Sequence, residues 1–107
     1  MPTIEIVTTV ESEDQAEKLA KTLVDQRLAA CVQMEPITSI YRWQGTVESA
    51  KEIRCTIKTD SSRRKDIQLL FKTLHPYDLP QWVERTIAPG HAGQAYDAWV
   101  AEQARRP

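Results

Sequence analysis

The feature that most constrains this chain is a long extended segment with one turn in its middle. Residues 28–59 are rich in β-branched and apolar side chains, and Gln44 and Gly45 divide them into two halves. Because glycine supplies the positive φ that a two-residue turn needs, the pattern predicts a β-hairpin. Each strand would exceed the usual length of about 5–6 residues. We expect an interruption at Pro36 and a bulge within residues 48–52, where apolar and polar residues alternate poorly.

The start of the chain predicts one strand and one helix. Residues Thr3–Val10 form a β-branched run that is typical of a buried strand. Ser12 can cap a following helix while Gln15 reaches back three residues later, which is the capping-box pattern. The apolar residues that follow recur at helical spacing and predict one buried face, made of Ala16, Leu19, Ala20, Leu23 and Val24.

The second half of the chain repeats this order. A helix is predicted to start at Asp60 and Ser61, and its apolar face consists of Ile67, Leu70, Phe71 and Leu74. Pro76 ends the helix, because proline disfavours the helical conformation at the residue before it, His75. The remaining predicted elements are a strand over Gln81–Ala88, a loop over Pro89 to Gly93, and a short helix with Tyr96, Trp99 and Val100 on one side.

The order strand–helix–strand–strand–helix–strand indicates an α+β fold of the ferredoxin-like type, with both helices on one face of the sheet. The 107 residues fit a single domain spanning 1–107. Two helices of this length cannot cover all of the long hairpin. A hairpin that carries Tyr41 and Trp43 near its tip should therefore pack on another subunit, which predicts a homo-oligomer.

Charge and composition exclude several classes of function. The net charge of −1 gives no general attraction for nucleic acid or anionic lipid. The first residues have no basic start and no long apolar segment, so neither a secretory signal nor membrane insertion is expected. Two cysteines, Cys31 and Cys55, are expected to be reduced thiols. Together these features favour a cytoplasmic protein.

Four stretches occur in a recognisable series: LAACVQ, ITSIYRWQGTVESAKEI, IKT and LHPYDLP, with Tyr96 and Trp99 near the end. Together they resemble the CutA divalent-ion tolerance family over nearly the whole chain. The resemblance implies a ferredoxin-like fold and a homotrimer, similar in architecture to the PII-type signalling proteins and locked together by the long hairpins. It also implies a link to tolerance of copper and other divalent metals. No catalytic reaction is attached to the family, so we expect neither an enzyme nor a required cofactor.

The resemblance implies one residue as a metal ligand. The ligands proposed in copper-binding members include a cysteine at the end of the first strand and two consecutive histidines before the proline. The corresponding positions here are Thr8 and Leu74, and only His75 carries an imidazole. His75 is therefore the candidate ligand for a divalent metal such as copper. The alternative is a helix-terminal histidine that satisfies backbone carbonyls.

The predicted ligand site is a cleft between subunits, lined by Tyr77, Lys58, Tyr41 and Trp43 beside His75. Each of these residues has an alternative role: packing for Tyr77, a solvated surface position for Lys58, and contacts between subunits for Tyr41 and Trp43. Three functions remain open. They are a trimeric metal-binding or signalling module in metal tolerance, a PII-like sensor of a small anionic effector or nucleotide, and a structural trimer that scaffolds a partner.

Overall fold

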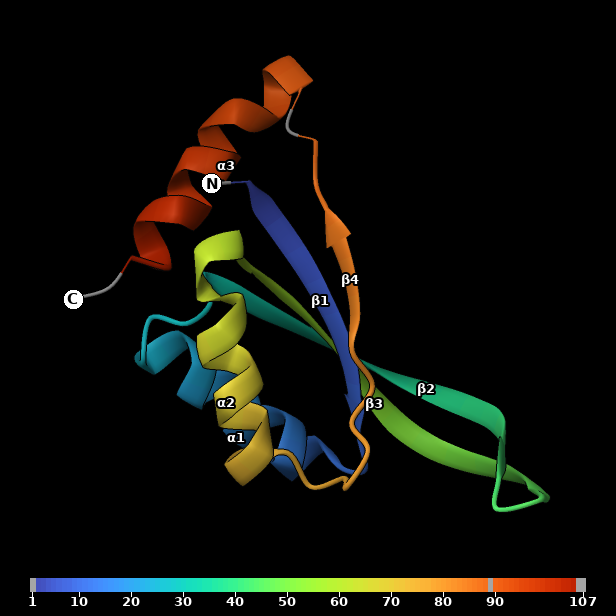
Figure 1. The fold of residues 1–107 in the computed structure, drawn as a ribbon. Coiled ribbons are helices and arrows are strands. Elements are labelled where there is room, and N and C mark those ends of the chain that lie inside the picture. Colours follow the sequence, from blue (N-terminus) through green and yellow to red (C-terminus); the bar gives the residue numbers. More distant parts are fainter. Residues whose placement is uncertain (1, 89, 106–107) are drawn as a thin grey trace.

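The computed structural model describes residues 2–88 and 90–105. Its helices and strands follow one another in the order predicted from the sequence (Figure 1). The strands are β1 (Thr3–Val10), β2 (Cys31–Trp43), β3 (Thr46–Asp60) and β4 (Val83–Thr86). The helices are α1 (Glu13–Asp25), α2 (Arg64–Leu74) and α3 (Gly90–Gln103), with a 3-10 turn at Ser61–Arg63. The strands form one antiparallel sheet in the order β2-β3-β1-β4, which confirms the ferredoxin-like prediction.

One hydrophobic core joins the sheet to α1 and α2. Its members from the strands are alternate residues that share one face of the sheet: Ile4, Ile6, Val10, Ile53, Cys55 and Ile57. Its members from the helices are those of the predicted apolar faces, chiefly Ala16, Leu19, Leu23, Ile67 and Phe71. Burial of each large side chain contributes roughly 1.5–3 kcal/mol. Of the predicted face of α1, only Val24 is exposed.

The hairpin of β2 and β3 projects well beyond this core (Figure 1). Its register runs without a break from the pair Cys31–Lys58 to the pair Trp43–Thr46. The bulge predicted within residues 48–52 was therefore wrong. Alternation is poor here because the strand has left the core over residues 48–51, where no side chain is buried, so no period is imposed on it.

Pro36 does not interrupt β2, contrary to expectation. It pairs with Ile53 within the continuous ladder. Proline is tolerated there because β2 is an edge strand, where a missing N–H can face away from the sheet. At the tip, Gln44 and Gly45 both have positive φ, at 50° and 83°, which confirms the predicted two-residue turn.

β4 is shorter than the predicted Gln81–Ala88. It pairs with β1 only over Val83–Thr86. Trp82 makes no ladder pair with β1, and its ring instead packs edge-on against Phe71 at 5.3 Å. The contact with Phe71 of α2, and not pairing with β1, therefore sets the position of Trp82.

The last helix covers part of the second face of the sheet. It begins at Gly90, so the loop predicted up to Gly93 was wrong for residues 90–93, whereas Pro89 lies outside the described residues. Glycine is compatible with a loop and with a helix, so the glycines at 90 and 93 did not distinguish the two in the sequence. The Tyr96 hydroxyl lies 3.6 Å from the Cys31 sulfur, and Val100 is fully buried.

Ser12 caps α1 as predicted, and removing this cap should weaken the fold. The Ser12 hydroxyl accepts from the Gln15 amide at 3.2 Å, and the Gln15 side chain accepts from the Ser12 amide. We expect Ser12→Ala to lower the free energy of unfolding by about 1 kcal/mol, because one helix N–H loses its acceptor. Urea unfolding measures this change. Ser12→Asp should retain stability, and a Ser12→Ala protein as stable as the parent would contradict the prediction.

Candidate functional site

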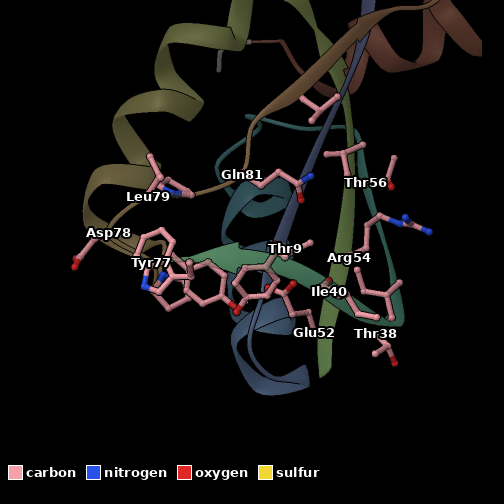
Figure 2. A pocket seen from close by; sticks show the side chains of 18 of the residues that line it. Thr9, Thr38, Ile40, Glu52, Arg54, Thr56, Tyr77, Asp78, Leu79 and Gln81 are labelled. Atoms are coloured by element: carbon pink, nitrogen blue, oxygen red, sulfur yellow. Dashed lines mark hydrogen bonds between the residues drawn. The ribbon is translucent and has the colours of Figure 1, made fainter. Parts of the chain in front are cut away.

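An open cavity of about 1380 Å³ lies on the face of the sheet that α1 and α2 leave uncovered. Its floor consists of alternate residues of two central strands: Glu5, Val7 and Thr9 of β1, and Glu52, Arg54 and Thr56 of β3. Residues of β2 between Ile37 and Trp43 line it on one side; they belong to the part of the hairpin that projects beyond the core, which we call the arm. Residues 76–81 line it on another side. Figure 2 shows these side chains, with Gln81 and Leu79 coming from the loop and Thr38 and Ile40 from β2.

The structure brings together three of the five predicted site residues. Tyr77, Tyr41 and Trp43 all line the cavity. His75 lies directly behind Tyr77, with 5.4 Å between the ring centroids, and is only 8% exposed. Lys58 is not among the lining residues, because its ammonium lies 5.8 Å from the centre of the Tyr96 ring, against α3. The ligand-binding roles of these residues stay predictions.

Both ring nitrogens of His75 are engaged in hydrogen bonds. Nδ1 accepts from the backbone N–H of Tyr77 at 3.1 Å, which places the proton of the neutral ring on Nε2. Nε2 lies 3.0 Å from the Thr8 hydroxyl and donates to it. Burial beside Phe71 lowers the pKa of His75, and a hydrogen bond at the Thr9 backbone offsets part of this effect. His75 is therefore held as a neutral ring that links β1 to the loop.

Glu52 is a site residue that the sequence did not indicate. It is 9% exposed, and its Oε2 accepts a hydrogen bond of 2.8 Å from the Tyr77 hydroxyl. Figure 2 shows the two side chains turned toward each other within the cavity. Burial raises the pKa of Tyr77, and the hydrogen bond and negative charge of Glu52 raise it further. Glu52 stands in the poorly alternating run of β3, so only knowledge of the register would have placed it on the cavity face.

The two arginines of the cavity already have carboxylate partners. Arg54 donates to Glu35 at 2.9 Å, and Arg85 lies 3.4 Å from Glu5. Figure 2 shows the Arg54 side chain extending away from Glu52 and Tyr77. The part of the cavity around Tyr77 is therefore acidic and aromatic in character.

Comparison with known proteins places the chain in a family. The sequence model of the family described as CutA1 divalent ion tolerance protein matches residues 4–103. The chain belongs to the CutA family. The divalent-cation tolerance protein CutA of Thermus thermophilus is 42% identical over 98 residues, which cover 91% of this chain and 93% of that protein.

Solved CutA structures have the same fold. CutA from Synechococcus elongatus superimposes with a TM-score of 0.89 at 32% identity, covering 97% of this chain and 91% of the other. The PII-like protein CutA from Nostoc reaches a TM-score of 0.89 at 26% identity, covering 97% and 99%. These matches confirm the CutA fold and its PII-like architecture.

The residues of this CutA chain do not fit a copper site within one subunit. Both nitrogens of His75 make hydrogen bonds, and its neighbours are the weak ligand Thr8 and the apolar Leu74. Across residues 2–88 and 90–105, no three His, Cys, Asp or Glu side chains are grouped so that they could hold a metal ion. A metal on His75 would have to replace one of its two hydrogen bonds, so this role stays a prediction.

The neutral state of His75 should make stability fall on mild acidification. Its pKa is lowered in the folded state, so the unfolded chain takes up a proton at higher pH than the folded chain does. Stability should therefore decrease as the pH falls through about 6.5, the ordinary pKa of histidine, and continue to fall down to the lowered folded value. Thermal unfolding between pH 7.5 and 5.5 measures this loss.

The control for this experiment is His75→Gln, which cannot titrate. Its midpoint should change less over the same pH range than that of the parent. The second histidine, His91, is present in both proteins, so the comparison isolates His75. An equal loss of stability in parent and variant would contradict the assignment of a buried neutral ring.

Proposed function

We propose that this CutA chain is a homotrimeric divalent-cation response protein, which acts as a binding or signalling module and catalyses no reaction. Family membership supports the role in metal tolerance. The exposed apolar arm of the hairpin carries the proposal of a trimer. Ile40 and Val47 are 75% and 59% exposed, and Tyr41 and Trp43 are 43% and 48% exposed on the other face of the arm.

An arm that carries exposed large apolar side chains on both faces favours contacts with other copies of the chain. Large exposed apolar surfaces mark interfaces in soluble proteins. The edge strand β2 adds a row of backbone groups that another strand can pair with. The cavity lies at the base of this arm, so a neighbouring subunit packed on the arm would turn the cavity into a cleft between subunits.

The alternative of an anionic effector has less support. The arginines that line the cavity are paired with carboxylates, and Lys58 lies apart from the cavity under Tyr96. An anion would therefore have to displace an existing ion pair before it gained a partner.

A cytoplasmic location stays a prediction. Among the described residues, no helix combines the length and the apolar character needed to span a membrane. The similar structure from Archaeoglobus fulgidus is described as a periplasmic divalent cation tolerance protein.

The trimer is tested by the mass in solution. Light scattering should give about three times the chain mass of 12.2 kDa. Replacing Ile40 and Val47 together by aspartate should shift the protein toward the monomer, because charges would then be buried against the neighbour. The matched control is Leu69→Asp on α2, where the side chain is 60% exposed and lies away from the hairpin. A parent protein of about 12.2 kDa would contradict the trimer.

Direct copper binding should be weak. Calorimetry on untagged protein should show a Kd no tighter than about 100 μM, which corresponds to roughly 5–6 kcal/mol, because the His75 nitrogens are already engaged. Leu74→His is the comparison variant and should bind more tightly, since it supplies a second imidazole next to the first. Tight binding by the parent that His75→Gln abolishes would contradict this expectation and establish His75 as the ligand.

A further inference from the structure

The cavity is larger than a site for a small ligand needs to be. Its volume of about 1380 Å³ exceeds the roughly 300–1,000 Å³ that is typical of small-molecule pockets. Its walls carry exposed apolar side chains, because Leu79 of the loop is 72% exposed and Val83 of β4 is 39% exposed. An open cavity of this size and character can receive a segment of polypeptide.

The arm of the hairpin borders the cavity of its own chain but does not fill it. Its register is unbroken up to the pair Trp43–Thr46 beside the turn, so the arm projects from the core as one continuous ribbon (Figure 1). Val47, close to the tip, is 59% exposed and is not among the residues that line the cavity. Within one chain the apolar tip of the arm therefore stays uncovered, which is typical of a surface that contacts another chain.

The charges of the arm and of the cavity are complementary. Around Tyr77 the cavity is lined by Glu52 and Asp78, and neither carboxylate forms an ion pair within the described part of the chain. Arg42 shares a face of the arm with Val47, its partner in the ladder, and has no carboxylate partner among the same described residues. An arm that entered the cavity of another copy would bring an unpaired guanidinium to an acidic surface.

We propose that the tip of the arm of one copy docks in the cavity of the next copy, with Val47 against Leu79 and Arg42 facing the carboxylates around Tyr77. The contact joins two different surfaces of the chain and is therefore heterologous. Such contacts close into a ring of three when successive copies are related by a three-fold rotation. The inference rests on the proposed trimer, and it names the surface that each arm occupies in that trimer. The cleft that remains between two copies is then smaller than the cavity of one chain.

Cross-linking between cysteines placed on the two surfaces tests the docking. In a Cys31→Ser background, a chain with both Val47→Cys and Leu79→Cys should be joined by a short bis-maleimide into covalent dimers and trimers on a denaturing gel. Cys55 is fully buried and does not react. The control combines Val47→Cys with Glu17→Cys, which lies on α1 at the opposite side of the sheet, and should run as single chains.

A change of charge at the tip tests the same docking without a cross-linker. Arg42→Glu should raise the protein concentration at which half of the trimers dissociate by at least roughly tenfold, because a carboxylate would then face the carboxylates of the cavity. Light scattering on a dilution series measures this concentration. Lys18→Glu makes the same change of charge on α1 and should dissociate as the parent does.

Three results would overturn the inference. They are a trimer that the double cysteine variant fails to cross-link, an Arg42→Glu trimer that dissociates as the parent does, and covalent dimers of Val47→Cys alone, which would show that two arms meet symmetrically. Light scattering on the same samples separates this failure from a failure of the proposed function. A trimer with any of these results contradicts the docking of the arm in the cavity alone, whereas a monomeric parent contradicts the proposed trimer and the docking together.

Discussion

The hydrogen bonds of His75 hold together the end of the molecule that carries the cavity. Through Thr8 the ring is tied to β1, and through the Tyr77 amide it is tied to the loop after α2. The Tyr77 hydroxyl then reaches Glu52 on β3. Residues from three separate segments are thereby fixed in one chain of polar contacts. Such a buried network stabilises a single geometry only when each member is satisfied, so the position of Tyr77 in the cavity depends on the hydrogen bonds of His75.

Only the base of the hairpin is stabilised by packing on the core. Near β1 its residues alternate between a buried and an exposed face, because one face packs on the core. Beyond Glu52 the strands continue in perfect register with no core beneath them, and apolar side chains such as Ile40 and Trp43 remain exposed. The ladder supplies backbone hydrogen bonds, but a two-stranded ribbon is only marginally stable by itself in water. The packing partner proposed for the arm would stabilise it and would also close the cavity into a cleft.

This difference explains what the sequence could predict. Where residues pack on the core, burial imposes a period, and the apolar faces of α1 and α2 followed from it. The Ser12 cap followed from hydrogen bonds between neighbouring residues, which a local pattern also reveals. Outside the core the period disappears, and the bulge predicted within residues 48–52 was wrong. Glu52 was missed because its partner Tyr77 lies 25 residues away in sequence. The position of Lys58 depends on α3 crossing to the second face, which no local pattern reveals.

The roles considered for His75 exclude one another within a single chain. As a metal ligand the ring must offer a nitrogen lone pair, yet Nδ1 uses its lone pair for the Tyr77 amide and Nε2 carries the proton given to Thr8. A metal at Nδ1 would release the Tyr77 amide and with it the anchor of the Tyr77 hydroxyl on Glu52. Metal binding at His75 would therefore be coupled negatively to any ligand whose binding needs the hydrogen bond between Tyr77 and Glu52, and by linkage the ligand would weaken metal binding equally.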